Sequence, residues 1–130
     1  METDDLYTLA NRARNHAYAP YSNFLVGAAL LTEEGKVFTG CNVENLSFGL
    51  TCCAERVALF SAVAAGIKRF TRLVIVADSR EPVTPCGACR QVMAEFAPDL
   101  EVVCLNLQGE KFAARLGELL PRPTAGILDK

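Results

Sequence analysis

The sequence has few of the residues on which several common enzyme and membrane classes depend. It contains one histidine, His16, and no tryptophan. A single histidine argues against a Ser-His-Asp triad and against a zinc site built on a His-x-Glu motif. His16 falls in the first helical pattern, away from the motifs below, and we expect it to be structural or solvent-exposed. No apolar run approaches the roughly 20 residues of a membrane-spanning helix, so we expect no membrane partner.

A strong charge of one sign is also lacking. The 13 Lys and Arg against 15 Asp and Glu give a formal net charge of −2, without runs of like charge. Binding a nucleic acid polymer depends on clustered Lys and Arg, so that class of partner is not expected. Residues 1–5 are acidic and lack the apolar core of a signal peptide. We therefore expect a cytoplasmic location and reduced thiols for the six cysteines.

The composition is that of a chain with a packed core. At 130 residues, 51% of them hydrophobic, the sequence predicts a single domain over residues 1–130. Hydrophobic periodicity and turn residues place the elements along it. Helices are expected over 4–18, from Cys53 to Ala65, from Cys86 or Gly87 to before Pro98, and as one turn at 116–121. Strands are expected over 24–31, 36–39, 73–77, 102–105 and 111–114.

This order of elements predicts an α/β fold, a three-layer sandwich on a mixed sheet of about five strands. Strand, helix, strand, helix and strand between residues 36 and 105 make two βαβ crossovers, which join parallel strands. The strand at 111–114 follows a short link and should run antiparallel to its neighbour. The helix at 53–65 is apolar on nearly every side, which indicates cover by the sheet and by a second subunit.

Two short segments carry the candidate chemistry, Cys-Ala-Glu-Arg at 53–56 and Pro-Cys-Gly-Ala-Cys at 85–89. Each opens a helix after one of two successive parallel strands, so both should lie at the edge where open α/β sheets bind ligands. Three thiolates suit tetrahedral Zn²⁺ and leave its fourth position for water. Cys53, Cys86 and Cys89 are therefore the candidate ligands of one Zn²⁺ per subunit.

Two neighbours of Cys53 have roles that such a site needs. Glu55 can move the protons of a metal-activated water, although a first-turn glutamate is also favoured by the helix dipole alone. Arg56 can offset the net −1 charge of three thiolates on Zn²⁺ by donating to their sulfurs, with a solvated surface arginine as the alternative. Together with the thiols, these residues indicate a zinc hydrolase and, within that class, a deaminase.

The thiols also allow other interpretations. Cys86 and Cys89 can form a disulfide or simply pack, and Cys52 rivals Cys53 as a ligand by spacing. Cys41 and Cys104 lie in strand patterns and are expected to be small buried hydrophobic residues. A structural zinc module needs a fourth protein ligand, for which Cys52 is the nearby thiol, and a redox protein needs Cys86 and Cys89 to cycle as a disulfide. Neither alternative explains Glu55 together with Arg56.

The two motifs resemble those of the small homotetrameric cytidine deaminases of nucleoside salvage. The likeness extends to Tyr-Ala-Pro-Tyr-Ser-Asn-Phe-Leu-Val-Gly-Ala-Ala-Leu at 18–30, Gly-Cys-Asn-Val-Glu-Asn at 40–45 and Glu-Leu-Leu-Pro at 118–121. The resemblance implies a cytidine deaminase-like fold and a homotetramer with shared active sites. It implies hydrolysis of cytidine and deoxycytidine to uridine and deoxyuridine plus ammonia, by attack of zinc-bound hydroxide at C4 with Glu55 as proton shuttle.

The same resemblance implies contacts with the substrate. Phe24 would face the pyrimidine ring, Asn42 and Glu44 would bond the ribose hydroxyls, and the backbone at Ala54 and Thr84 would contact the base edge. Without the family, Phe24 is a core aromatic at the start of a strand, and Asn42 and Glu44 are turn residues after one. A carboxylate at Glu44 would also repel a phosphate, which favours a free nucleoside.

The chain departs from the family pattern at two places. Phe48 stands where the family often has tyrosine, and no aromatic residue follows Leu-Leu-Pro at 119–121. Base affinity and substrate range depend on these positions, whereas the zinc chemistry does not. The nearest rival function is a deaminase for another aminated heterocycle, such as blasticidin S.

Overall fold

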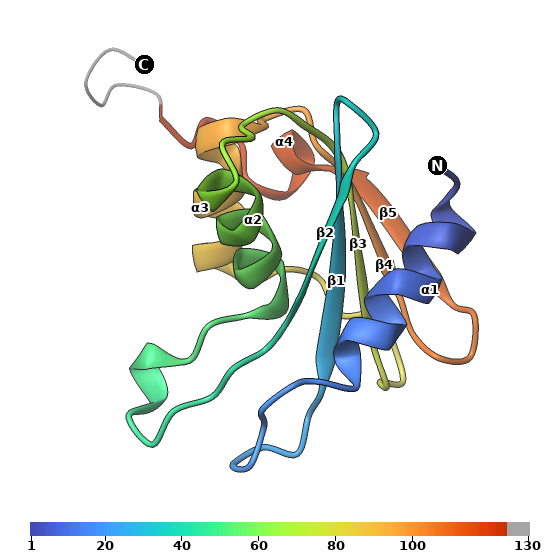
Figure 1. Cartoon of the computed structure of the whole chain (residues 1–130), viewed down its shortest axis with the longest axis vertical. Helices are drawn as coiled ribbons and strands as arrows, with labels where there is room; N and C mark the ends of the chain where they lie inside the picture. The colour runs from blue at the N-terminus through green and yellow to red at the C-terminus, as the bar shows by residue number, and fades with distance from the viewer. Residues whose placement is uncertain (125–130) are drawn as a thin grey trace.

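The computed structural model describes residues 1–124, which form a five-stranded sheet with helices on both faces (Figure 1). The strands are β1 (Val26–Thr32), β2 (Val37–Cys41), β3 (Phe70–Ala77), β4 (Glu101–Leu105) and β5 (Lys111–Arg115). The sequence shows no aromatic residue after Leu-Leu-Pro at 119–121. Residues 125–130 of that segment lie outside the described residues.

The sheet is mixed, as predicted, and its strand order is β2-β1-β3-β4-β5. Strands β3 and β4 pair in parallel, whereas β1 pairs antiparallel with both β2 and β3, and β5 pairs antiparallel with β4. Strands β2, β3 and β4 therefore run in one direction, as the two crossovers require. The first crossover skips a position, because β1 lies between β2 and β3.

Helices cover both faces of this sheet and complete the predicted three layers. Helix α1 (Thr3–Arg14) packs on one face, against β1, β2 and β3. Helix α2 (Ala54–Ala64) lies on the other face over β1 and β2, beside α3 (Gly87–Phe96), and the short α4 (Leu116–Leu119) contacts α3 (Figure 1). Two clusters of buried apolar side chains, one on each side of the sheet, form the core.

Two local features differ from the sequence prediction. Helix α1 ends at Arg14, so the expected helix over 4–18 is too long, and His16 is exposed in the turn that follows. The chain leaves the helix there because Tyr18 forms a β-bridge with Val43. A 3-10 turn, η1 (Phe48–Leu50), was not predicted. None of the helices within residues 1–124 has the length and apolar character needed to cross a bilayer.

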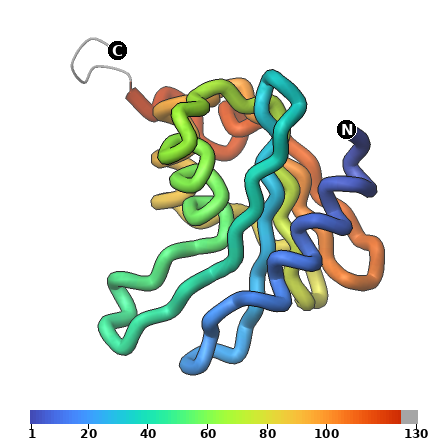
Figure 2. Tube along the Cα trace, in the orientation of Figure 1, coloured from blue at the N-terminus to red at the C-terminus, as the bar shows by residue number. Residues whose placement is uncertain are grey.

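The carboxyl ends of β2 and β3 meet at one end of the sheet, where each leads into a helix. The loops at 15–25 and 42–52 lie side by side at this end (Figure 2), joined by the Tyr18–Val43 bridge. Gly40 lets α2 begin close to β2, because a β-carbon there would overlap the carbonyl of Ala54 and the amide of Ala58. The sequence thus brings the start of α2 against the sheet edge.

Candidate active site

Three cysteine sulfurs converge where α2 and α3 begin. Cys53 is the N-cap of α2, Cys86 is the N-cap of α3, and Cys89 lies in the first turn of α3, fully buried. The Sγ of Cys86 lies 3.4 Å from that of Cys89 and 3.9 Å from that of Cys53. All three lie within 4.8 Å of one another, and no other such group of possible ligands occurs among residues 1–124.

This donor set fits tetrahedral zinc. Zn–S bonds of about 2.3 Å at tetrahedral angles place sulfurs roughly 3.8 Å apart. The pKa of Cys53 is lowered to about 5, chiefly by its hydrogen bond with the Cys89 thiol and then by Arg56. The same bond and burial raise the pKa of Cys89. Zinc binds cysteine as the thiolate, so a metal ion bound here would displace the thiol protons.

The rival thiols lie apart from this cluster. Cys52 is half-buried in a β-bridge with Val43 and does not join the three sulfurs. Cys104 is fully buried in β4, as predicted for a small hydrophobic residue, and burial raises its pKa to about 12. Cys41 is only half-buried at the end of β2. Among residues 1–124, three of the six thiols converge, so a zinc ion held by them would keep its fourth position open.

Glu55 and Arg56 follow Cys53 on the first turn of α2 and face different surroundings. Glu55 is 5% exposed, and burial raises the pKa of its carboxyl group. The Nη2 of Arg56 lies 3.4 Å from the Sγ of Cys53 and 3.4 Å from the carbonyl oxygen of Thr51. Its buried Nε has no hydrogen-bond partner among the described residues. Arg56 is therefore a half-buried neighbour of the sulfur cluster rather than a solvated surface arginine.

A cavity of about 250 Å³ opens in front of Glu55 and the thiols. It brings together every substrate contact that the sequence suggests, from four separate segments of the chain. Its lining consists of Ser22, Phe24, Val26, Asn42, Glu44, Thr51, Cys53, Ala54, Glu55, Val83, Thr84 and Cys86. Cys89 is not part of this lining, so the cavity is lined by two of the three thiols and by the carboxyl groups of Glu44 and Glu55.

Asn42 and Glu44 are held by the loop that precedes β1. The Oδ1 of Asn42 accepts from the amide of Val26 at 2.9 Å, and its Nδ2 donates to the carbonyl of Phe24 at 2.8 Å. The Oε1 of Glu44 accepts from the amides of Tyr21 (2.9 Å) and Ser22 (3.1 Å). These bonds fix the side chains of Asn42 and Glu44, and both residues line the cavity. The two residues therefore bind the loop backbone, as turn residues do, and also belong to the candidate site.

Sequence analysis did not identify Ser22, which connects two residues of the cavity. Its hydroxyl donates to the Oε2 of Glu44 and accepts from the amide of Phe24 at 3.0 Å. The bond from Ser22 is the main cause that lowers the pKa of the Glu44 carboxyl group. The only signal in the sequence is that Ser22 lies between Tyr21 and Phe24 in the segment 18–30. This position does not show that its partner is Glu44, 22 residues away.

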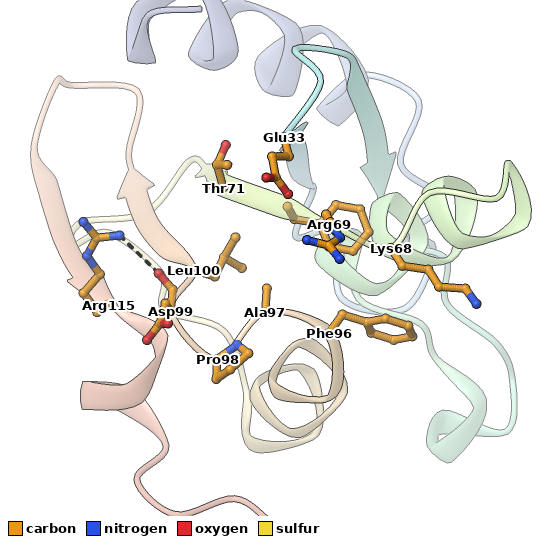
Figure 3. A pocket seen from close by; sticks show the side chains of 11 residues that line it. Glu33, Lys68, Arg69, Thr71, Phe96, Ala97, Pro98, Asp99, Leu100 and Arg115 are labelled. Atoms are coloured by element: carbon orange, nitrogen blue, oxygen red, sulfur yellow. Dashed lines mark hydrogen bonds between the residues drawn. The ribbon is translucent and has the colours of Figure 1, made fainter.

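A second cavity, of about 660 Å³, lies elsewhere, between the start of β3 and the end of α3 (Figure 3). Its walls combine apolar groups such as Phe96 and Leu100 with the exposed charges of Glu33 and Lys68. In Figure 3, Arg115 donates to the backbone oxygen of Asp99, at 3.1 Å. This cavity has no thiol, so the smaller one carries the metal chemistry.

The fold and the site define a class of protein, the zinc hydrolases with three thiolate ligands and an open coordination position. Comparison with known proteins narrows this class. The family model described as cytidine and deoxycytidylate deaminase zinc-binding region matches residues 1–105. The cytidine deaminase of Sporosarcina psychrophila is 48% identical over 93% of this chain and 90% of its own length. The cytidine deaminase of Halalkalibacterium halodurans is 52% identical over 93% of this chain and 92% of its own length.

Solved structures agree with these relatives. The crystal structure of cytidine deaminase from Burkholderia pseudomallei has a TM-score of 0.91 and 56% identity, covering 93% of this chain and 98% of that one. The crystal structure of cytidine deaminase from Mycobacterium leprae has a TM-score of 0.79 and 38% identity, covering 93% of this chain and 98% of that one. The chain belongs to the cytidine deaminase family. It is a zinc-dependent hydrolase that deaminates cytidine.

Proposed function

We propose that the cavity binds cytidine or deoxycytidine as the free nucleoside and that Glu55 moves the protons of the hydrolysis. The observation that carries this proposal is a buried carboxyl group beside three converging thiols in one cavity. Zn²⁺, one per subunit, held by Cys53, Cys86 and Cys89, activates the attacking water as a Lewis acid when bound. The remaining steps belong to the protein's own side chains.

Glu55 then acts as base and acid in turn. It takes a proton from the activated water and delivers it to N3 of the cytosine ring, which makes C4 electrophilic. After the hydroxyl group has added to C4, Glu55 takes the proton of that hydroxyl and passes it to the amino group, so that the C4–N bond breaks and uridine or deoxyuridine and ammonia are released. Burial raises the pKa of this carboxyl group, which favours its protonated form and so its role as proton donor to the substrate.

The substrate contacts proposed here follow the lining of the cavity. Phe24 faces the pyrimidine ring, Asn42 and Glu44 bond the ribose hydroxyls, and the backbone at Ala54 and Thr84 contacts the base edge. All five residues line the cavity, and the hydrogen bonds to Glu44 keep its carboxylate ionised. An ionised Glu44 accepts hydrogen bonds from sugar hydroxyls and repels a 5′-phosphate, which favours nucleoside over nucleotide.

We further propose that the enzyme is a homotetramer with shared active sites. Leu46, Phe48 and Leu50 are 79%, 72% and 69% exposed, and the ring of Phe48 packs edge-on against Tyr21 at 5.6 Å beside the cavity. On the outer side of α2, Phe60 is 46% exposed. Such an apolar surface favours contact with another subunit. A monomer in light scattering would contradict this proposal.

The chain is also proposed to be one catalytic domain over residues 1–130 in the cytoplasm. The family model spans residues 1–105, and the solved relatives cover 93% of the chain. A site of three thiolates needs reduced cysteines, which the cytoplasm maintains. All six cysteines are free of disulfides in the structure.

The experiment that tests the proposed function follows the ultraviolet absorbance of cytidine incubated with the zinc-loaded protein. Deoxycytidine, cytidine monophosphate and adenosine are run in parallel. Loss of the amine from cytidine and deoxycytidine alone is the expected result. Equal turnover of cytidine monophosphate would contradict the role of Glu44, and no turnover of any nucleoside would shift the assignment to another aminated heterocycle.

Changing Arg56 to Ala should slow catalysis more than it destabilises the fold. The guanidinium lies 3.4 Å from the sulfur of Cys53, and its loss leaves the excess charge of the thiolates without an offset. We expect kcat to fall about 10- to 100-fold, the range typical for residues that support metal ligands. Steady-state kinetics of the zinc-loaded variant measure this, with the exposed Arg12→Ala as control. Unchanged kinetics would refute the neutralising role.

Changing Ser22 to Ala should weaken substrate binding. The variant loses the hydroxyl that fixes the Glu44 carboxylate and the Phe24 amide, and the pKa of Glu44 should rise toward its ordinary value. We expect KM for cytidine to rise roughly three- to tenfold with little change in kcat, the sign of lost uniform binding. Ser61→Ala, which removes a hydroxyl bonded within α2, is the matched control. An unaltered KM would show that Ser22 does not contribute to substrate binding.

A further inference from the structure

Arg90 joins three separate pieces of the protein through one guanidinium group. It lies on α3, directly after Cys89. Its Nε donates to the carbonyl of Pro85 at 2.7 Å, its Nη1 to the carbonyl of Leu119 at 2.9 Å, and its Nη2 to the Oγ1 of Thr84 at 3.3 Å. A planar fork of donors satisfies acceptors in three directions, which a lysine ammonium on a single flexible stem does not reproduce.

Two of the three acceptors, the carbonyl of Pro85 and the hydroxyl of Thr84, belong to the segment that forms one wall of the cavity before Cys86. Residues 82–85 belong to no helix or strand, and Pro85 has no amide hydrogen to donate. Among the described residues, the hydrogen bonds that reach residues 82–85 come from Arg90 alone. Val83 and Thr84 line the cavity. The position of this wall therefore depends on one side chain that does not itself line the cavity.

The third acceptor belongs to the last described part of the chain. Leu119 is the final residue of α4, which packs beside α3 (Figure 1). Next to Arg90, the Nε2 of Gln91 donates to the carbonyl of Pro123 at 3.3 Å. Neighbouring residues of α3 thus hold the segment 119–123, and Arg90 connects that segment with the wall of the cavity.

We propose that Arg90 is a positioning residue for substrate binding. It holds the backbone at Thr84 where the base edge would lie and ties this wall to the segment 119–123. The proposal rests on the proposed function, since Thr84 matters only if the base binds beside it. A residue that positions the base without moving protons affects KM and leaves the chemical step nearly intact.

The test compares Arg90→Met, Arg90→Lys and Arg115→Met with the wild-type enzyme, all zinc-loaded at 25 °C. Arg90→Met keeps much of the apolar stem and removes all donors. We expect its KM for cytidine to rise about tenfold with kcat changed less than about threefold, because a displaced wall weakens binding before chemistry. Arg90→Lys should recover part of the loss. Arg115→Met, which loses its bond to Asp99 at the distant cavity, should keep the wild-type KM.

Hydrogen exchange and zinc content separate positioning from a general loss of structure. In Arg90→Met, the amide of Leu120, which donates to the carbonyl of Leu116, should exchange faster, while zinc stays at one per chain. A wild-type KM in folded Arg90→Met, or a fall in kcat that tracks loss of zinc, would overturn the proposal. If Arg90→Met fails to fold, unchanged KM in both Arg90→Lys and Thr84→Val overturns it. Absence of cytidine turnover in the wild type would instead refute the proposed function.

Discussion

Changing Glu55 to Gln should abolish nearly all turnover of cytidine while the protein keeps its zinc, its fold and its affinity for substrate. Glutamine has almost the same shape as glutamate, so the buried site next to Ala54 stays filled. The glutamine amide acts as neither acid nor base near neutral pH, and every proton transfer proposed here passes through the carboxyl group of Glu55. Positioned acid–base groups contribute about 10²- to 10⁴-fold, and we expect a loss of kcat of that order or larger.

The measurement is single-turnover kinetics with zinc content determined on the same sample. Glu34→Gln, which makes the same change at an exposed turn, should leave the rate unchanged. Glu55→Asp keeps the carboxyl group but withdraws it by one methylene, so its rate should fall between those of the wild type and Glu55→Gln. Substantial activity in zinc-loaded Glu55→Gln would show that another group moves the protons and would refute the shuttle.

The convergence of the three thiols could be predicted because it follows from the order of elements. Two crossovers place the starts of the second and third long helices at one edge of the sheet, whatever the strands between them do. The positions of Cys53, Cys86 and Cys89 at or beside those starts then bring their sulfurs together. The structure confirms this and separates Cys52 from the cluster, which spacing alone could not do.

The strand order was not predictable in the same way. Periodicity shows which residues of a strand face the core, but not which strand lies beside it. The place of β1 between β2 and β3 is a matter of pairing across distant parts of the chain. The end of α1 at Arg14 depends likewise on a bridge between Tyr18 and Val43, which no local pattern shows.

The residues that support the site were the least accessible to sequence analysis. Ser22 contacts Glu44 across 22 positions, and Arg90 contacts Leu119 across 29. Both are polar residues next to recognisable motifs, and their type says that they can hydrogen-bond but not with what. Ligand and acid–base groups are constrained by the chemistry of the metal, whereas supporting groups are constrained only by the geometry of the finished fold.

Changing Cys89 to Ala should remove zinc from the protein. Cys89 is fully buried with its sulfur 3.4 Å from that of Cys86, so the variant leaves two thiols and no replacement donor in the cluster. Even residues that only support metal ligands affect zinc affinity about 10- to 100-fold, so loss of a ligand should weaken it by at least about 100-fold. Activity should fall in proportion to bound zinc, measured after dialysis against a chelator.

Cys104→Ala is the matched control for this change, because Cys104 is an equally buried thiol outside the cluster. Both variants lose the packing of one sulfur, so both should unfold at a lower temperature. Only Cys89→Ala should also lose the rise in unfolding temperature that added zinc gives the wild type, since binding to the native state adds to stability. Wild-type zinc content in Cys89→Ala would exclude Cys89 as a ligand. Because Cys52 is the nearest unused thiol in sequence, the double variant with Cys52→Ala would then show whether Cys52 had replaced it.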